Sequence, residues 1–316
     1  MSKIGFIGYG NMGQMVINNI LSLKLLKEEE IILSNRTMSK LDNLKEKYPL
    51  LEVTSDNSYL AKKCNKIFIF VETPEFKTLL EEIATSLNEN SHIIHVCAGL
   101  TFENISNIFH GKVSQVIPTI ISTYNEIAIS NQKYSSNNNQ KGISLILHNS
   151  KLDLNDKNFV ESLFNKFSYI KILDTDRNNK NNTISRNGEK NDEYKDIGSD
   201  KNNDTKIATI LTSCGPAFLS LVIRKIAITA CKNTSLSYLE LENMLIKTML
   251  GTSIQLNDKN LDIDEILTKT TTKKGITENG LKYLDNEVEK IVSELFSQLL
   301  LKYEEVENNL NKEYCN

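Results

Sequence analysis

Three glycines near the start of the printed sequence have the spacing of a nucleotide-binding turn, Gly8-x-Gly10-x-x-Gly13. In such a turn the first glycine permits a tight bend, the second lets a diphosphate approach the backbone, and the third lets the next helix lie close to the strand. The N–H groups at the helix start then face the phosphates, and the helix dipole favours their negative charge. The pattern predicts that a dinucleotide diphosphate is bound by Gly8, Gly10, Asn11, Met12 and Gly13.

Glycines also occur in ordinary turns, so the surroundings of the triplet decide between the two interpretations. An apolar run precedes it at residues 4–7, a helical pattern follows, and a second apolar run lies at residues 31–34. This order and spacing are typical of a βαβ unit that binds a dinucleotide.

The residues after the second apolar run, Ser34-Asn35-Arg36-Thr37, indicate which dinucleotide is bound. An Asp or Glu here would accept hydrogen bonds from the free ribose hydroxyls of NAD. A guanidinium beside neutral hydrogen-bonding groups suits a 2′-phosphate instead. We therefore expect Asn35, Arg36 and Thr37 to bind NADPH, with NADH as the alternative. The competing interpretation is that Arg36 is only a solvated surface residue.

Short apolar runs alternate with helical patterns through the first half of the chain, which is typical of stacked βαβ units around a parallel sheet. Strands are expected near residues 4–7, 31–34, 52–54, 67–71, 93–97 and 114–117, with helices near 14–23, 38–47, 57–62, 76–88 and 102–108. Ligands of open α/β sheets bind at the carboxyl ends of the strands. Ala98 and Gly99 are therefore expected to line the cofactor crevice.

After Pro118, two further segments at residues 126–131 and 142–148 flank a polar stretch at 135–141, which is expected to form a hairpin loop or loose connection. A helix near 157–167 and a strand at 169–173 would complete a domain of residues 1–173. Residues 174–204 are almost entirely polar and cannot bury enough apolar surface to offset the entropy lost on ordering. They are expected to form a disordered insertion.

Residues 205–316 are expected to form an all-helical second domain, with helices at 214–232, 238–256 and 263–267 and a long final helix from about Glu278. Apolar residues recur in that last helix at three- and four-residue steps, which indicates one broad apolar face. The face would pack in a core or against a second copy of the chain, and we expect a homodimer. The fold class is thus α/β, a Rossmann-type doubly wound sheet followed by helices.

Composition limits the classes of partner. Lys and Arg total 37 against 40 Asp and Glu, giving a net charge of −3, so no basic surface suggests nucleic acid. Five scattered cysteines and four scattered histidines lack metal-ligand spacing, so no metal site is expected. We find no targeting segment and no apolar stretch of eighteen residues, so we expect a cytoplasmic protein that binds a small molecule and no membrane.

Four motifs resemble the pyrroline-5-carboxylate reductase family. They are the glycine turn, Ser34-Asn35-Arg36-Thr37, Ser213-Cys214-Gly215-Pro216-Ala217-Phe218, and Lys274-Gly275-Ile276-Thr277-Glu278-Asn279-Gly280-Leu281. The resemblance implies a Rossmann domain followed by a helical dimerisation domain, with each active site shared between two subunits. It also implies that Asn57 reaches the adenosine of the cofactor, with helix capping as the alternative.

The chain also departs from the family pattern. Arg-x-Met-Pro-Asn becomes Gln115-Val116-Ile117-Pro118-Thr119, and Ser-Pro-Gly-Gly-Thr-Thr becomes Thr272-Lys273-Lys274-Gly275-Ile276-Thr277. These variants are similar to a divergent branch, the late competence protein ComER. The resemblance to that branch leaves open a regulatory or binding protein with weak or no reductase activity.

The resemblance implies reduction of 1-pyrroline-5-carboxylate to L-proline, a hydride transfer to a C=N bond that demands mainly positioning. The substrate carboxylate would bind backbone N–H groups of Gly275, Ile276 and Thr277 at the start of the final helix. Thr277 would also donate a hydrogen bond near the imine nitrogen, as the catalytic residue, or would only cap the helix. The small residues of Gly215-Pro216-Ala217 would leave room for the nicotinamide or substrate ring, or Pro216 would only mark a helix start. Cys214 and Gly215 are expected among the substrate-binding residues.

Two further questions concern Cys214 and a third class of enzyme. The thiol is expected at a helix start, which could lower its pKa, although a buried inert thiol is favoured. A β-hydroxyacid dehydrogenase shares the same plan, but it would need a lysine in the helix that carries Gly215-Pro216-Ala217-Phe218, which supplies none.

Overall fold

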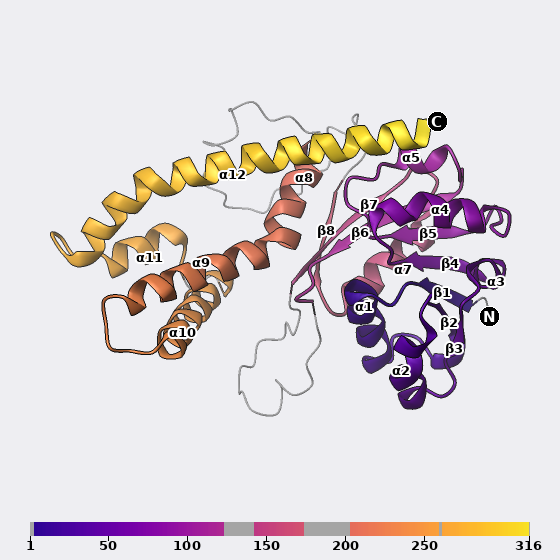
Figure 1. The fold of residues 1–316 in the computed structure, drawn as a ribbon, viewed down its shortest axis with the longest axis horizontal. Coiled ribbons are helices and arrows are strands. Elements are labelled where there is room, and N and C mark those ends of the chain that lie inside the picture. Colours follow the sequence, from indigo (N-terminus) through magenta and orange to yellow (C-terminus); the bar gives the residue numbers. More distant parts are fainter. Residues whose placement is uncertain (1–2, 123–141, 174–202, 259–260, 316) are drawn as a thin grey trace. The chain divides into compact units, whose positions relative to one another are not determined.

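The computed structural model describes residues 3–122, 142–173, 203–258 and 261–315 (Figure 1). The chain forms two compact units. The first contains Met1–Ser213 and Tyr303–Asn316, and the second contains Cys214–Lys302. The segment at 126–131, the polar stretch at 135–141 and nearly all of the 174–204 insertion lie outside the described residues.

The first unit is built on an eight-stranded sheet of order β3-β2-β1-β4-β5-β6-β7-β8 (Figure 1). The six strands from β3 to β6 are parallel, and β7 runs antiparallel to β6. The order reverses at β1, so β2 and β4 lie on opposite sides of it, as in a doubly wound dinucleotide-binding sheet. The strands are β1 (Lys3–Ile7), β2 (Ile31–Ser34), β3 (Glu52–Thr54), β4 (Cys64–Ile69), β5 (His92–His95), β6 (Lys112–Pro118), β7 (Ile143–His148) and β8 (Tyr169–Ile172).

The helices of the first unit follow the expected order, and side-chain caps explain several of their first residues. Asp153 accepts a hydrogen bond from Asp156 N, so α7 begins three residues before the expected position. The helices are α1 (Asn11–Ser22), α2 (Asp42–Lys47), α3 (Asn57–Lys63), α4 (Thr73–Ala84), α5 (Phe102–Ser106), α7 (Leu154–Phe164) and α8 (Asp204–Thr209), with short 3₁₀ turns at Glu28–Glu30 and Met38–Leu41.

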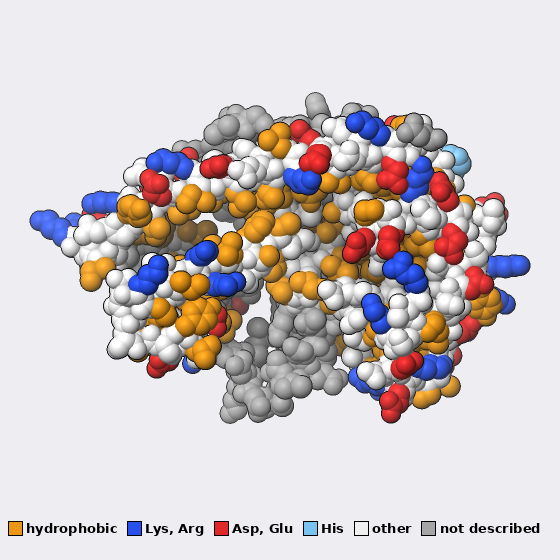
Figure 2. Space-filling view, in the orientation of Figure 1, with side chains coloured by type: hydrophobic (Ala, Val, Ile, Leu, Met, Phe, Trp, Pro, Cys, Tyr) orange, Lys and Arg blue, Asp and Glu red, His pale blue; other side chains and the backbone are white. Residues whose placement is uncertain are grey.

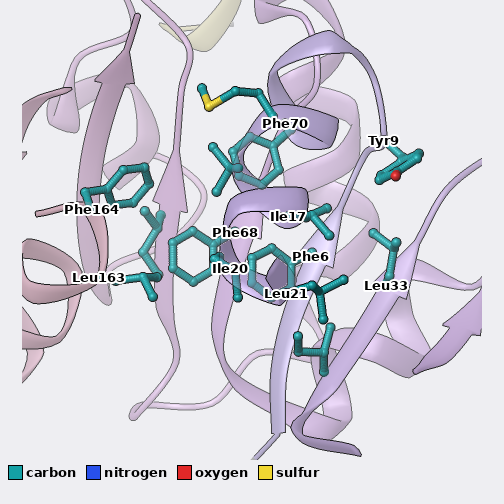
Figure 3. Packing of buried hydrophobic residues seen from close by; sticks show 14 of the residues in the cluster. Phe6, Tyr9, Ile17, Ile20, Leu21, Leu33, Phe68, Phe70, Leu163 and Phe164 are labelled. Atoms are coloured by element: carbon teal, nitrogen blue, oxygen red, sulfur yellow. The ribbon is translucent and has the colours of Figure 1, made fainter. Parts of the chain in front are cut away.

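Two hydrophobic clusters cover the two faces of this sheet. On one face Phe6 of β1 stacks on Phe68 of β4, with ring centroids 4.8 Å apart, under side chains of α1 and α7 (Figure 3). On the other face Ile7 and Ile69 belong to a cluster with buried side chains of α3, α4 and α5. Neighbouring residues of one strand point to opposite faces, so burial on both sides requires the nearly continuous apolar runs seen in the sequence.

The second unit contains α9 (Gly215–Cys231), α10 (Tyr238–Asn257), α11 (Ile263–Thr270) and most of α12 (Ile276–Cys315). Among the described residues of α9, α10 and α11, only Ala227 is buried. Large apolar side chains stand exposed on these helices and on α12, including Leu219, Val222, Leu250, Leu284 and Ile291. Figure 2 shows hydrophobic side chains along the surface of this unit.

The helical stretch Asp204–Cys231 has a mean hydropathy of 1.6 over its most apolar window and is long enough to cross a membrane. The expectation that no such stretch occurs is therefore wrong. Only 11% of that window is buried within the described chain. Length and composition alone do not distinguish a membrane span from a helix that packs on another protein surface.

Three histidines of the first unit, His92, His95 and His148, are buried. His95 of β5 is fully buried against Phe76, and neither ring nitrogen has a hydrogen-bond partner in the described chain. Burial lowers the pKa of His95 to about 3. Burial also lowers the pKa of His92 to about 3 and that of His148 to about 4, while Ser114 Oγ lies 2.8 Å from His92 Nε2 and 2.7 Å from His148 Nδ1.

These histidines predict how the stability depends on pH. A histidine whose pKa is lower in the folded state takes up a proton on unfolding. Its contribution to the free energy of unfolding is therefore fully present above the unfolded pKa of 6.5 and is lost as the pH drops towards 3. His95→Phe removes one such proton and should flatten this fall by about 1.4 kcal/mol per pH unit. Urea unfolding at pH 7.5, 5.5 and 4.5 measures this dependence of the free energy of unfolding on pH. The exposed His110→Gln is the control, and an unchanged slope in His95→Phe would contradict the account.

Candidate functional site

The glycine turn joins β1 to α1, and each glycine has a distinct steric environment. Gly8 has φ +99°, and a Cβ there would lie 2.5 Å from Phe70 O. At Gly13 a Cβ would lie 2.3 Å from Gly8 O, so the helix rests directly on the turn. Gly10 has no atom within 4 Å of a Cβ position. The first and third glycines are therefore required for folding, and the space beside the second is open to a ligand.

Helix α1 presents its first turn to that open space. Its N-cap is Gly10, no side chain caps it, and no acidic residue lies in its first turn. The first N–H groups of a helix have no partner within the helix, so those of Asn11, Met12 and Gly13 are available to an anion. The neighbouring Gly8 N donates to Ser34 O at 2.8 Å, which fixes the turn to β2.

Asn35 connects the glycine turn to the loop after β2. Tyr9 N donates to Asn35 Oδ1 at 3.0 Å, and Asn35 Nδ2 donates to Thr37 O at 2.7 Å. The side chain thus uses one end of its amide to hold the glycine turn and the other to hold its own loop. The sequence predicted contact between Asn35 and the cofactor, which stays a prediction; the structure shows the bridging position of the side chain.

Arg36 follows in the same loop and lies in solvent. Its side chain is 90% exposed, and Nη1 lies 3.4 Å from Glu75 Oε1 of α4. An ion pair this exposed contributes little energy, so the guanidinium is free to turn towards another anion. Thr37 is also exposed. Both positions are compatible with phosphate recognition beyond the carboxyl end of β2.

Asn57 does not cap α3, because Asp56 occupies the cap and accepts from Tyr59 N at 2.8 Å. The capping alternative for Asn57 is wrong. Instead Ser34 Oγ donates to Asn57 Oδ1 at 2.6 Å, and Asn57 Nδ2 lies 3.2 Å from a carboxylate oxygen of Glu82. Asn57 therefore lies beside the carboxyl end of β2, near the loop that carries Arg36.

The loop of residues 97–101, here called the β5 loop, follows β5 at the same edge of the sheet. The register pairs Ile7 with Ile69 and Ile69 with His95, so the carboxyl ends of β1, β4 and β5 are aligned. Gly99 has φ +79°, a conformation that favours glycine. Burial raises the pKa of the adjacent Cys97 to about 12, so its thiol stays protonated and unreactive.

Sequence reasoning missed two residues that shape this edge. Gln115 of β6 donates from Nε2 to Cys97 O at 2.6 Å and so ties the β5 loop to the neighbouring strand. Phe70 supplies the carbonyl that limits Gly8. Neither residue type signals a ligand, so only the folded geometry identifies them. Thr119 takes the position of the family's asparagine, but it is buried and its hydroxyl donates to Ile143 O at 2.8 Å.

Cys214 and Gly215 lie where a π-helical turn, Ile210–Cys214, leads directly into α9. The helix start expected at Gly215 is therefore not a free terminus. The wider π-helical turn tolerates Pro216, which has no backbone N–H to donate within the helix. Such turns are frequent at functional sites. Burial raises the pKa of the Cys214 thiol, as expected for an inert thiol.

The last candidate residues begin α12. The helix starts at Ile276, so Thr277 is its second residue and not its cap; the capping alternative is wrong. Among the described residues no group hydrogen-bonds the exposed Thr277 hydroxyl. Lys274 adopts φ 58°, a strained conformation for a residue that replaces glycine in the family. Glu278 accepts a hydrogen bond from Lys274 N.

The structure thus brings the candidate cofactor residues together on the first unit. The candidate substrate residues Cys214, Gly215, Gly275, Ile276 and Thr277 all belong to the second unit. In the part of the chain that the structure describes, no cluster of His, Cys, Asp or Glu could hold a metal ion.

Family models match two parts of the chain. Residues 3–99 match the family of NADP oxidoreductase, coenzyme F420-dependent, and residues 202–306 match the pyrroline-5-carboxylate reductase dimerisation family. The first match spans the glycine turn and ends within the β5 loop. The second spans the helices that leave apolar side chains exposed. Together they agree with a Rossmann-type sheet followed by a helical dimerisation domain.

Similar proteins cover almost the whole chain. Pyrroline-5-carboxylate reductase of Methanobrevibacter smithii is 34% identical over 285 residues, which are 90% of this chain and 97% of that protein. ComE operon protein 4 of Bacillus subtilis (strain 168) is 24% identical over 312 residues, 99% of each chain. The crystal structure of Plasmodium falciparum pyrroline carboxylate reductase with NADP bound has a TM-score of 0.70 at 20% identity, covers 97% of both chains, and shows the shared fold.

The glycine turn predicts a contrast between two alanine variants. Gly13→Ala places a methyl group against Gly8 O and should destabilise the protein by about 1–3 kcal/mol. Gly10→Ala meets open space at φ −78° and should leave stability unchanged or slightly higher. Gly10→Ala should nevertheless weaken dinucleotide binding at least about tenfold, because the methyl group blocks the diphosphate. Thermal unfolding and fluorescence titration measure both quantities. Tight binding by Gly10→Ala would contradict the assignment.

Proposed function

This chain belongs to the pyrroline-5-carboxylate reductase family, and from that premise we propose that it reduces 1-pyrroline-5-carboxylate to L-proline with NADPH. The observation that carries the proposal is the turn built around Gly8, Gly10 and Gly13, whose open side faces the uncapped start of α1. The pyrroline-5-carboxylate reductase of Methanobrevibacter smithii, which is 34% identical along nearly its full length, supports this reaction.

NADPH is the proposed cofactor because the loop after β2 has no carboxylate to accept from ribose hydroxyls. Asn35 holds this loop against the glycine turn, and Arg36 stands beside it with an exposed guanidinium. A guanidinium pairs with a phosphate through two hydrogen bonds. NADH stays the alternative, and a coenzyme bound here would supply hydride from its nicotinamide ring.

The substrate residues are proposed to act by positioning. The Thr272–Gly275 turn is closed by Gly275 N donating to Thr272 O at 2.9 Å, and α12 begins immediately after it. The first N–H groups of this helix suit the substrate carboxylate. Thr277, whose hydroxyl is unbonded in the described chain, is proposed to donate to the imine nitrogen. Cys214 and Gly215 are proposed to leave room for the ring.

A homo-oligomer accounts for the apolar surface of the second unit. Its described helices α9, α10 and α11 bury only Ala227, and large exposed apolar areas mark association surfaces. We propose a homodimer or higher homo-oligomer in which the cofactor domain spans 1–173 and the helical domain spans 205–316. A cytoplasmic location, with neither membrane nor nucleic acid as partner, is part of the same proposal.

A second candidate function is a regulatory or binding protein similar to ComE operon protein 4. One observation favours it: Thr119 occupies the position of the family's asparagine but uses its hydroxyl to hold β7. A side chain bound to backbone in this way does not reach a substrate. The fold and the coenzyme would then persist without proline formation.

The direct test is turnover with the two compounds of the proposed reaction. The purified protein should oxidise NADPH when 1-pyrroline-5-carboxylate is added, and the loss of absorbance at 340 nm should match the L-proline formed. Thr277→Val should lower kcat at least about tenfold because it removes a hydrogen-bond donor, whereas Thr277→Ser should retain most activity. NADPH binding without turnover in the unmodified protein would instead support the second candidate.

Arg36 predicts the preference between the two coenzymes. Arg36→Ala should raise the KM for NADPH about tenfold or more and change the KM for NADH less than about twofold, because only NADPH carries the 2′-phosphate. Steady-state kinetics with each coenzyme measure the ratio. Thr37→Ala, in the same exposed loop, is the matched variant for loss of a neutral contact. Equal effects of Arg36→Ala on both coenzymes would remove the argument for phosphate recognition.

A further inference from the structure

The last turns of α12, residues 303–315, belong to the first unit and are here called the C-terminal segment. Leu310 and Tyr314 are buried in the same hydrophobic cluster as Cys97, Leu100 and Ile105. The end of α12 lies beside α5 and α4 (Figure 1). After the helices of the second unit, the chain thus returns to the hydrophobic cluster that contains residues of the β5 loop.

The C-terminal segment contacts the β5 loop closely. A Cβ at Gly99 would lie 3.2 Å from Val306 Cγ1 and 3.9 Å from Leu310 Cδ1. The loop therefore has little room to move towards α12. The left-handed conformation of Gly99 and the nearby side chains of Val306 and Leu310 restrict where the backbone of the loop can lie.

A hydrogen bond ties the segment to the end of the same loop. Thr101 and Asn104 form a capping box at the start of α5, with Asn104 N donating to Thr101 Oγ1 at 3.2 Å. The Asn104 side chain is buried, and its Nδ2 donates to Asn311 Oδ1 at 2.8 Å. Asn311 thereby satisfies a buried amide that also holds the last residue of the β5 loop.

The remaining contacts anchor the helix end. Lys77 of α4 donates to Glu313 O and lies 5.6 Å above the Tyr314 ring. Asn107 Nδ2 donates to Tyr314 O at 3.3 Å. Lys206 pairs with Glu307 at 2.8 Å. Donors near the last carbonyl groups of a helix stabilise its end, so the segment is held at several points.

The sheet order shows which half of the coenzyme lies near this loop. The diphosphate is assigned to the turn after β1, and the adenosine half to the loop after β2, on one side of β1. The other half of the dinucleotide then extends to the opposite side, over the ends of β4 and β5. The β5 loop is consequently next to the nicotinamide half, as the proposed function requires.

We propose that Val306, Leu310 and Asn311 of α12 are positioning residues, which hold the β5 loop together with Gln115 of β6, so that the nicotinamide half of the coenzyme is bound in one orientation. The proposal rests on the proposed function for the identity of the coenzyme. It assigns to the C-terminal segment a role in coenzyme binding, although the segment contains none of the predicted cofactor residues.

Two probes separate positioning from general stability: NADPH, which spans both halves of the site, and 2′,5′-ADP, which occupies only the adenosine half. Asn311→Ala removes the acceptor for Asn104 and should weaken NADPH binding about fivefold, the value of one hydrogen bond, while 2′,5′-ADP affinity stays within about twofold. Leu310→Ala should have a larger effect of the same kind. Isothermal titration of the full chain measures both affinities.

Three controls make the outcome decisive. Asn311→Asp keeps the acceptor and should restore NADPH affinity, and Asn309→Ala, at an exposed position of the same turn, should match the unmodified protein. Equal NADPH affinity in all variants would overturn the proposal, as would parallel losses for NADPH and 2′,5′-ADP. If the unmodified protein bound neither probe, the proposed function itself would fail.

Discussion

The close approach of three backbone segments at Gly8, Gly13 and Phe70 is the constraint on which the rest of the site depends. A Cβ at either glycine would come within 2.5 Å of a carbonyl oxygen, so no other residue fits without moving a strand. This contact lies beside β1, where the strand order reverses. It brings the uncapped start of α1 to the edge where β1, β2, β4 and β5 end, and Asn35 then ties the β2 loop to the same place.

Much of this arrangement could be predicted because its causes are local. Strand ranges followed from apolar runs buried on both faces, and the glycine turn followed from spacing that few other structures need. The helix-capping alternatives were wrong because a neighbouring residue caps or begins the helix instead. Asp56 caps α3, which leaves Asn57 free to join Ser34 to Glu82, and Ile276 begins α12, which places Thr277 within the helix.

Other features could not be predicted because they depend on residues distant in the sequence. Gln115 supports Cys97 O only once β5 and β6 are paired, and Asn311 meets Asn104 only after α12 returns to the first unit. Neither has a periodicity or motif of its own. The length of the apolar helix Asp204–Cys231 was also missed, because Pro216 suggested a helix start where a π-helical turn allows continuation.

The departures from the family pattern share one physical consequence. Gln115 in β6 and Thr119 just after it both donate hydrogen bonds to backbone carbonyl groups of this chain, and so support neighbouring segments. The candidate cofactor residues of the first unit offer backbone N–H groups at the start of α1. The candidate substrate residues of the second unit offer the start of α12 and a Thr277 hydroxyl that no described group hydrogen-bonds. Hydride transfer to a C=N bond needs orientation more than acid or base groups. A site that has replaced ligand-facing side chains by internal supports is therefore consistent with that chemistry, provided that the supports hold the β5 loop rigidly.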